Sequence, residues 1–353
     1  MFKSKPDYEQ AQKRIDAFWN HEETDRPMVL MNYPKQTAKP FKNKQHASSK
    51  DYWLDIEYRA EEALHYAENT VYCAESMPVY YPNLGPEILS VWAGCEIVFE
   101  KTTVWTEPCI SDWTTENAVI SMDHPMFKTL EKFTRILLEK AKGNFIVGLT
   151  DFHPGGDHLS ALRDAEKLLV DMLEVPDIIK AKLVSSYKEY FEVYDYFVKI
   201  LKEANMPIAT WLQITSQTTM YVPSNDFSCM ISSEMFNEFF LEGIRDECRH
   251  YKKSIYHLDG PGALQHLDSL LEIPELNALQ WVPGAGNEWV MPWLDVFKKA
   301  LKAEKSIIVY PQNIEDLHFL KEHLPSKGLC IQMWNVGNQE NADDLMKIIK
   351  RWG

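Results

Sequence analysis

The stretch SIYHLDGPGALQHL, residues 254–267, brings an imidazole and a carboxylate together at the end of an apolar run. Side chains alternate between the two faces of a β-strand, so His257 and Asp259 are predicted to point the same way at the strand's end. The Gly-Pro-Gly that follows allows a sharp turn out of the strand. The pattern therefore predicts two functional groups presented side by side at the edge of a sheet.

Cys330 adds a third side chain that can bind a metal, 71 positions after Asp259. Imidazole nitrogen, carboxylate oxygen and thiolate sulfur all bind zinc, and three protein ligands leave the fourth position for a substrate. The separation is too long for a local zinc finger and suits ligands carried on different strands. Two alternatives stay open: Cys330 packs as a small hydrophobe beside a His–Asp hydrogen bond, or His257 and Asp259 form an acid–base couple without metal.

The elements that must position these residues are a series of apolar runs separated by helical patterns. The runs that predict strands are 27–33, 71–80, 144–150, 208–214, 254–260, 277–283, 306–311 and 328–334. This alternation predicts an α/β protein with a parallel sheet, and eight repeats favour a (β/α)8 TIM barrel over an open, doubly wound sheet. Residues 85–121 interrupt the rhythm and predict an inserted β-hairpin region within a single domain, 1–353.

In a barrel of this kind, functional groups gather at the carboxyl ends of the strands. Asp226, in a loop before a helix, is a further catalytic carboxylate by this reasoning. The residues near strand ends that we expect to bind substrate are Tyr81, Asp151, Gln213, Trp281, Gln312 and Trp334. The aromatic residues near the mouth, which are Tyr80, Tyr81, Trp281, Trp289 and Trp334, favour a neutral or cationic ligand with an apolar or aromatic body.

The composition narrows the classes of partner. The net charge is −15, from 52 acidic and 37 basic residues, which disfavours nucleic acid and anionic membranes as partners. Six scattered cysteines predict reduced thiols, and no apolar run has membrane-spanning length, so we expect a cytoplasmic protein. Two Gly-x-Gly stretches carry Gln265 and Trp289 where a dinucleotide motif needs its third glycine.

Three longer stretches carry a resemblance to a known family. They are TDFHPGGDHLSALRDAEKLLVDMLEVPDIIKAKL, PSNDFSCMISSEMFNEFFLEGIRDECRHYKKSIYHLDG and GLCIQMWNVGNQENADDLMK. Together they resemble the uroporphyrinogen decarboxylase superfamily, which includes zinc-dependent, corrinoid-linked methyltransferases. The resemblance covers most of the chain and is weakest before residue 70. It implies a TIM barrel, and it does not select one reaction.

The methyltransferase branch implies a role for each residue that matches its motif. His257 matches the metal-binding histidine, Asp259 stands where the first ligand cysteine is found, and Cys330 falls close to the second. The aspartate departs from the pattern and makes a harder site, which suits an oxygen- or nitrogen-linked methyl donor better than a thiol. The resemblance thus implies zinc, a small methyl donor and a corrinoid (cobalamin) carried by a partner protein. Whether the chain forms a homodimer stays open.

Two other functions remain as alternatives. The first is a metal-independent decarboxylase that acts on a small acid through Asp226 and His257. The arginine-rich motif that holds porphyrinogen carboxylates in that branch has no counterpart in MVLMNYPKQTAKPF, and the chain has only eight arginines. The second is a binding protein that has lost catalysis, since Asp259 breaks the usual ligand pattern.

Overall fold

Seven strands form the central sheet of the protein. In the computed structural model, which describes residues 2–352, their order is β2-β1-β13-β12-β11-β10-β9. Neighbours from β1 through β13 to β9 are parallel, and β2 runs antiparallel beside β1. The bounds are β1 (Met28–Pro34), β2 (Thr70–Ala74), β9 (Met220–Tyr221), β10 (Lys253–Asp259), β11 (Ala278–Val282), β12 (Ser306–Val309) and β13 (Leu329–Met333).

Four of the strands outside this sheet have two residues each: β3 (Val79–Tyr80), β6 (Ile146–Val147), β7 (Ile208–Ala209) and β8 (Thr215–Ser216). β3 pairs parallel with β6, and Leu149 N donates to Ala209 O at 2.8 Å, which ties the end of β6 to β7. Across residues 2–352, no strand pairing joins these pieces and the seven-stranded sheet into one ring. The prediction of an α/β fold is confirmed, whereas eight continuous parallel strands are not found.

Two predicted strands differ from the structure for a local reason. The 208–214 run turns back at Gln213, which has a positive φ of 59°, so that β7 pairs antiparallel with β8. The neighbour of β10 is instead β9, which the sequence reading missed. The 71–80 run breaks at Ala74, where φ is 53°, into antiparallel β2 and the short β3.

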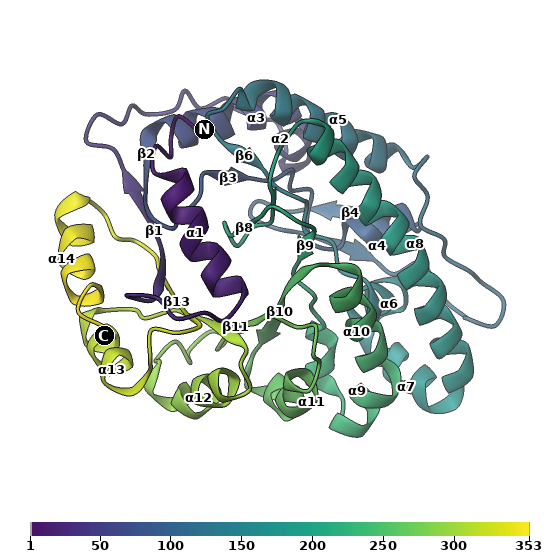
Figure 1. The fold of residues 1–353 in the computed structure, drawn as a ribbon. Coiled ribbons are helices and arrows are strands. Elements are labelled where there is room, and N and C mark those ends of the chain that lie inside the picture. The colour runs from purple at the N-terminus through teal and green to yellow at the C-terminus, as the bar shows by residue number, and fades with distance from the viewer. Residues whose placement is uncertain (1, 353) are drawn as a thin grey trace.

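Helices surround the strands on all sides in the view of Figure 1. The longer helices are α1 (Tyr8–Trp19), α3 (Ile56–Asn69), α5 (Pro125–Ala141), α6 (Gly155–Arg163), α7 (Ala165–Glu174), α8 (Pro176–Glu203), α10 (Leu241–His250), α12 (Leu294–Lys302), α13 (Ile314–His323) and α14 (Gln339–Ile349). Shorter ones are α2 (Ser49–Leu54), α4 (Ile88–Trp92), α9 (Ser233–Phe239), α11 (Leu267–Leu271) and the 3-10 helices η1 (Asp226–Met230), η2 (Pro261–His266) and η3 (Met291–Trp293). In the described part of the chain, none of them combines the length and apolarity that a bilayer crossing requires.

The strands of the central sheet bury both faces, which explains their nearly continuous apolar sequences. One face, which includes Ile255 and Cys330, belongs to a core shared with helices α1, α3, α5 and α8. The other face, which includes Leu258 and Trp281, packs in a second core with helices α9 to α14. Alternate residues of each strand therefore face different cores, and at the carboxyl ends the first face becomes polar.

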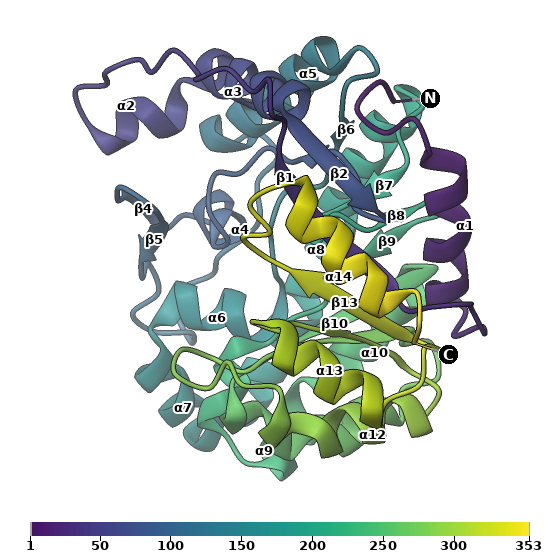
Figure 2. The same ribbon diagram turned by 90° about the vertical axis from the view of Figure 1, so that its left-hand side faces the viewer.

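The two ends of the strands differ. Residues at the end of α1 accept hydrogen bonds from the amino ends of three strands or the turns before them: Trp19 O from Lys253 and Asn277, and Phe18 O from Ser306. At the opposite end lies an antiparallel hairpin of β4 (Glu96–Phe99) and β5 (Val104–Glu107), inside the 85–121 segment where a hairpin was predicted (Figure 2). Helix α1 thus covers the amino ends, and the carboxyl ends carry the candidate site.

Candidate functional site

Three side chains meet at the carboxyl end of β10. Ligand atoms of Asp226, His257 and Asp259 all lie within 4.8 Å of one another. His257 and Asp259 share a face of β10, as their two-residue spacing predicted. Asp226 belongs to the segment that follows β9 and lies beside β10. His257 N donates to Pro223 O at 2.8 Å, and Ser224 forms a parallel bridge with His257. This pairing continues the β9–β10 ladder and places the start of η1 beside the imidazole.

The His257 ring is oriented by a chain of hydrogen bonds from two neighbouring strands. Its Nδ1 lies 2.7 Å from Oε1 of Gln280 on β11, and Gln280 Nε2 donates to the Tyr310 hydroxyl at 2.6 Å. An amide oxygen only accepts hydrogen bonds, so Nδ1 carries the proton and Nε2 is left with its lone pair. Nε2 faces Asp226, with Oδ1 of that residue 4.0 Å away.

The two carboxylates differ in their surroundings. Asp259 is half-buried, and burial raises its pKa, helped by the charge of Asp226 and opposed by His257. The side chain of Asp226 is 57 % exposed, and its Oδ1 accepts a hydrogen bond from Ser224 Oγ at 3.0 Å. One carboxylate is therefore held inside the site, while the other lies at its opening.

This donor set fits a divalent metal ion. Two carboxylates and one imidazole supply three ligands, and the Gln280 contact fixes the tautomer in which Nε2 binds a metal. The set is harder than a thiolate-rich one, so it accommodates zinc and also other divalent transition metals.

Cys330 lies outside this group. It is fully buried in the core on β13, and burial raises its pKa well above the usual range, which keeps the thiol protonated. Strand register places His257 opposite Gln280, Gln280 opposite Ile308 and Ile308 opposite Cys330, so three strand spacings along the sheet separate the two predicted ligands. The structure assembles Asp226 with His257 and Asp259 where the sequence pointed to Cys330.

A second group of titratable residues adjoins the first. His153 Nε2 lies 2.7 Å from Asp151 Oδ1, and Asp157 on α6 accepts a hydrogen bond from Phe227 N at 2.9 Å. Burial alone lowers the pKa of His153, but the neighbouring carboxylates, Asp151 above all, outweigh it and raise that pKa to about 9. Burial and the charge of Asp226 raise the pKa of Asp157 to about 6. At neutral pH His153 is therefore an imidazolium, and Asp157 titrates close to neutrality.

A cavity of about 340 Å³ joins these residues, because His153, Asp157 and Asp226 all line it. Asp151, predicted to bind substrate, thus enters the site through its ion pair with His153. The His153 ring also lies 5.5 Å from the ring of Trp211, edge to face. Trp211 in turn lines the next cavity.

Tyr81 and Gln213, both predicted to bind substrate, line a second cavity of about 320 Å³. Arg59 and Trp211 line it with them. Burial, together with the negative charge of Asp151, raises the pKa of Tyr81, so this hydroxyl stays neutral and can donate a hydrogen bond. The structure brings the two predicted residues together.

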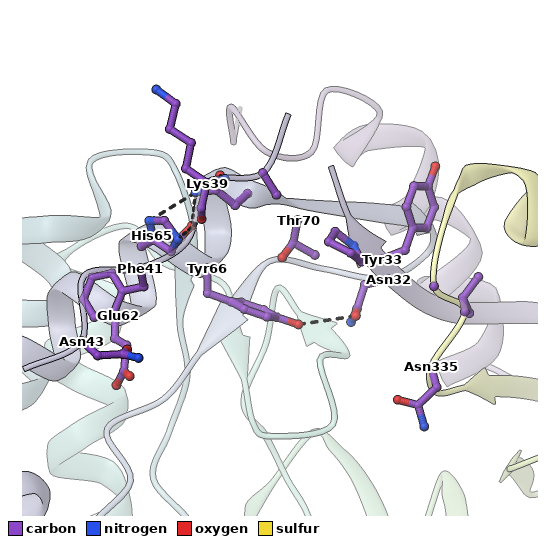
Figure 3. Close-up of a pocket in the computed structure, with 15 residues that line it drawn as sticks. Asn32, Tyr33, Lys39, Phe41, Asn43, Glu62, His65, Tyr66, Thr70 and Asn335 are labelled. Carbon is purple, nitrogen blue, oxygen red and sulfur yellow. Dashed lines mark hydrogen bonds between the residues drawn. The ribbon is translucent and has the colours of Figure 1, made fainter. Parts of the chain in front are cut away.

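A third cavity, of about 610 Å³, lies between β1, α3 and the segment after β13 (Figure 3). The Tyr66 hydroxyl donates to Asn32 Oδ1 at 3.4 Å across it, and Asn335 lies on the opposite wall. Tyr66 lines both this cavity and the one with Tyr81, so the two are neighbours.

Three other predicted substrate-binding residues have different positions. Trp281 is 2 % exposed and packs against Trp293, 5.0 Å away between ring centroids, in the core that faces the outer helices. It points away from Gln280, its neighbour on β11, and does not line the site. Gln312 is exposed and donates to Tyr310 O at 2.9 Å. Trp334 is 55 % exposed and its ring lies parallel to that of Tyr310, 6.4 Å away, at the edge of the site.

The sequence reading missed Gln280, Tyr310, Asp157 and Arg59. Gln280 could have been found, because it lies two residues after Ala278 on the same strand face, just as His257 follows Ile255. Asp157 and Arg59 lie on helices, and nothing in their local sequence distinguishes them from solvent-facing charges.

No protein-family model matches the sequence, and no curated protein matches it. Among solved structures, the chain is similar to a methyltransferase from Methanosarcina mazei, with a TM-score of 0.60 at 12% sequence identity. The similarity covers 97% of this chain and 98% of that one. The protein therefore shares its fold with that structure over nearly its whole length.

Proposed function

We propose that the protein is a methyltransferase that moves a methyl group between a small O- or N-methylated donor and a corrinoid (cobalamin) carried by a partner protein. A divalent metal, zinc in the first instance, is held by Asp226, His257 and Asp259. The proposal includes membership of the uroporphyrinogen decarboxylase superfamily and an overall arrangement of a TIM-barrel kind.

One observation carries the proposal: three side chains that can bind a metal converge at the carboxyl ends of the strands, and Gln280 orients their histidine through its Nδ1 atom. An imidazole held by such a contact is typical of metal ligands. The fold shared with a protein named a methyltransferase supports the same reaction class.

Each residue of the site has a separate role in this proposal. A bound metal would act as a Lewis acid on the heteroatom that carries the methyl group. Gln280 keeps His257 Nε2 free for binding, and Asp259 adds a half-buried carboxylate. The exposed Asp226 lies at the opening, where a ligand reaches it first. His153, charged at neutral pH, can supply a proton to a departing oxygen or nitrogen in the adjoining cavity.

A corrinoid protein would approach at the carboxyl ends, since α1 covers the amino ends (Figure 2). Large apolar side chains are exposed in the segments at or beside this end: Met230, Trp289, Met291 and Trp334. Such side chains are enriched at protein interfaces and suit contact with a partner.

Two measurements test the proposal. Protein purified without chelators is analysed for metal, and methyl transfer to a reduced corrinoid is assayed with methoxyarenes, methylamines and methylthiols as donors. We expect stoichiometric divalent metal and transfer from an oxygen- or nitrogen-linked donor. His257→Ala should abolish both, and His318→Ala, a histidine outside the site, should leave both unchanged. Protein that neither retains nor rebinds metal would overturn the proposal.

A decarboxylase or lyase without metal is the second candidate, and one observation favours it. The pKa values of His153 and Asp157, about 9 and about 6, bracket neutral pH, which suits a paired acid and base. In that case His153 and Asp157, and not the Asp226 and His257 first expected from the sequence, would act on the small acid. Metal-free protein would turn it over, and His153→Gln would abolish turnover while His257→Ala would not.

A further inference from the structure

Arg59 is a buried cation without a counter-ion. It is 4 % exposed, and no carboxylate oxygen within residues 2–352 lies within 4.0 Å of its guanidinium nitrogens. Arg26, which is buried to a similar degree, instead pairs with Glu75 at 2.8 Å. A buried charge is normally paired, because leaving water is costly. Arg59 is therefore an interior positive charge without a direct ion pair among residues 2–352.

Aromatic side chains hold the guanidinium of Arg59 in place. Its central carbon lies 5.0 Å from the ring centroids of Trp53 and Phe133 and 5.7 Å from that of Tyr52. Nη1 donates to Trp53 O at 2.9 Å, whereas Nε is buried without a hydrogen-bond partner among the described residues. The nearby carboxylate of Glu62 is engaged by the Tyr52 hydroxyl at 3.1 Å. The Nε atom is thus left unpaired, and the Tyr80 hydroxyl lies beside the same guanidinium.

Arg59 lines the cavity of about 320 Å³ described above. The other polar side chains there are neutral hydrogen-bonding groups, from Tyr66, Tyr80, Tyr81, Asn83 and Gln213. Trp211 supplies an apolar wall and also contacts His153, which links this cavity to the one beside the Asp226–His257–Asp259 group.

We propose that this cavity binds the carboxylate of a small organic molecule with a single negatively charged group, through the guanidinium of Arg59 and the neutral donors around it. A carboxylate can accept two parallel N–H groups from one guanidinium edge. A single buried positive charge balances one negative charge, and Asp151 already adds negative charge beside Tyr81. A doubly charged phosphate would therefore be left with an uncompensated charge.

The subsite changes the expected substrate from a neutral or cationic ligand to one that carries a carboxylate. Carboxylate binding by this cavity does not depend on the proposed function; only the identification of the ligand as the methyl donor does. Such a donor would carry a carboxylate at one end and its methylated heteroatom at the end toward His257. Two donor types meet this description, a methoxylated aromatic acid and an N-methylated amino acid.

Calorimetric titration of the full-length, metal-free protein tests the subsite without any methyl transfer. The probes are 4-methoxybenzoate and trimethylglycine, with 4-methoxybenzamide and choline as their neutral or cationic counterparts, and phenyl phosphate as the dianion. We expect one of the two carboxylates to bind at least about tenfold more tightly than its counterpart and than phenyl phosphate. Equal affinity for the carboxylate and its counterpart, or no binding of either carboxylate, overturns the inference.

Four variants separate binding from stability. Arg59→Met should lower carboxylate affinity by at least about tenfold, and Arg59→Lys should keep part of it. Arg135→Met, at an exposed arginine on α5, is the matched control and should bind like the wild type. Asn83→Asp provides a second test if Arg59→Met does not fold, because it places a competing carboxylate in the same cavity and should also abolish binding. Unchanged carboxylate affinity in Arg59→Met or in Asn83→Asp overturns the inference.

The two proposals fail in different ways. Carboxylate binding that depends on Arg59, without methyl transfer from any donor, supports the subsite and contradicts the methyltransferase proposal. Methyl transfer from neutral donors by a protein that binds no carboxylate contradicts the subsite alone.

Discussion

The Nδ1 atom of His257 lies 2.7 Å from the Oε1 atom of Gln280, its direct neighbour across the β10–β11 ladder. The same amide donates to the hydroxyl of Tyr310, which follows β12. Three adjacent segments thus cooperate to hold one imidazole with its Nε2 directed at the opening of the site. The contact converts a strand-end histidine into an oriented ligand.

Replacing Gln280 with leucine should weaken metal binding without removing any ligand. The imidazole would lose its only described ring hydrogen bond, and loss of such supporting contacts typically costs about 10- to 100-fold in metal affinity. Zinc titration of the apoprotein against a competing chelator measures the change. Gln312→Leu, at an exposed glutamine, is the control and should bind zinc normally. Equal affinities in the two variants would show that Gln280 has no role in positioning the ligand.

Removal of Asp226 should affect the metal more than removal of Cys330. Asp226→Asn is expected to lower zinc affinity strongly, since the amide is a much weaker ligand than a carboxylate. Cys330→Ala should retain zinc and lower the free energy of unfolding by about 1–2 kcal/mol, because it leaves a small cavity in the core. Metal content and urea unfolding are measured on both. Loss of zinc in Cys330→Ala but not in Asp226→Asn would restore the ligand set first expected from the sequence.

Trp281 and Trp334 should respond oppositely to truncation. Trp281→Ala removes a buried ring that packs on Trp293, and should lower the free energy of unfolding by about 3–5 kcal/mol. Trp334→Ala removes an exposed ring beside Tyr310, and should change stability by less than about 0.5 kcal/mol while weakening ligand binding. Urea unfolding and ligand titration separate the two effects. Normal stability in Trp281→Ala would contradict its place in the core.

Glu247 on α10 should make stability depend on pH. Burial raises its pKa from 4.5 to about 8, opposed by His153 and a hydrogen bond from Tyr251. The folded state then keeps a proton that the unfolded state has released, so the contribution of Glu247 to stability is full below pH 4.5 and is lost as pH rises through about 8.

The matched variant is Glu247→Gln, which is neutral at every pH. Its free energy of unfolding should equal that of the wild type near pH 4.5 and exceed it by roughly a few kcal/mol above pH 8. Urea unfolding at both pH values tests this. A difference between the two proteins that does not change with pH would rule out a raised pKa at this position.

Local sequence patterns were sufficient for part of this molecule. The two-residue period of SIYHLD determined that His257 and Asp259 share one face of a strand, and four later apolar runs appear as β10 to β13 close to their predicted bounds. These features depend on side-chain alternation and on burial of both strand faces, which are properties of short segments.

Tertiary structure decided the rest. Asp226, and not Cys330, joins the imidazole because the β9–β10 pairing continues through Ser224, whereas three strand spacings separate Cys330 from His257. Trp281 faces the outer helices, and Gln280 faces the site, although both belong to one apolar run. The position of β11 within the sheet determines which of its two faces contacts the outer helices. The unpaired charge of Arg59 is visible only once the neighbours of α3 are known. Strand register and helix packing join residues far apart in the chain, and no local pattern encodes those distances.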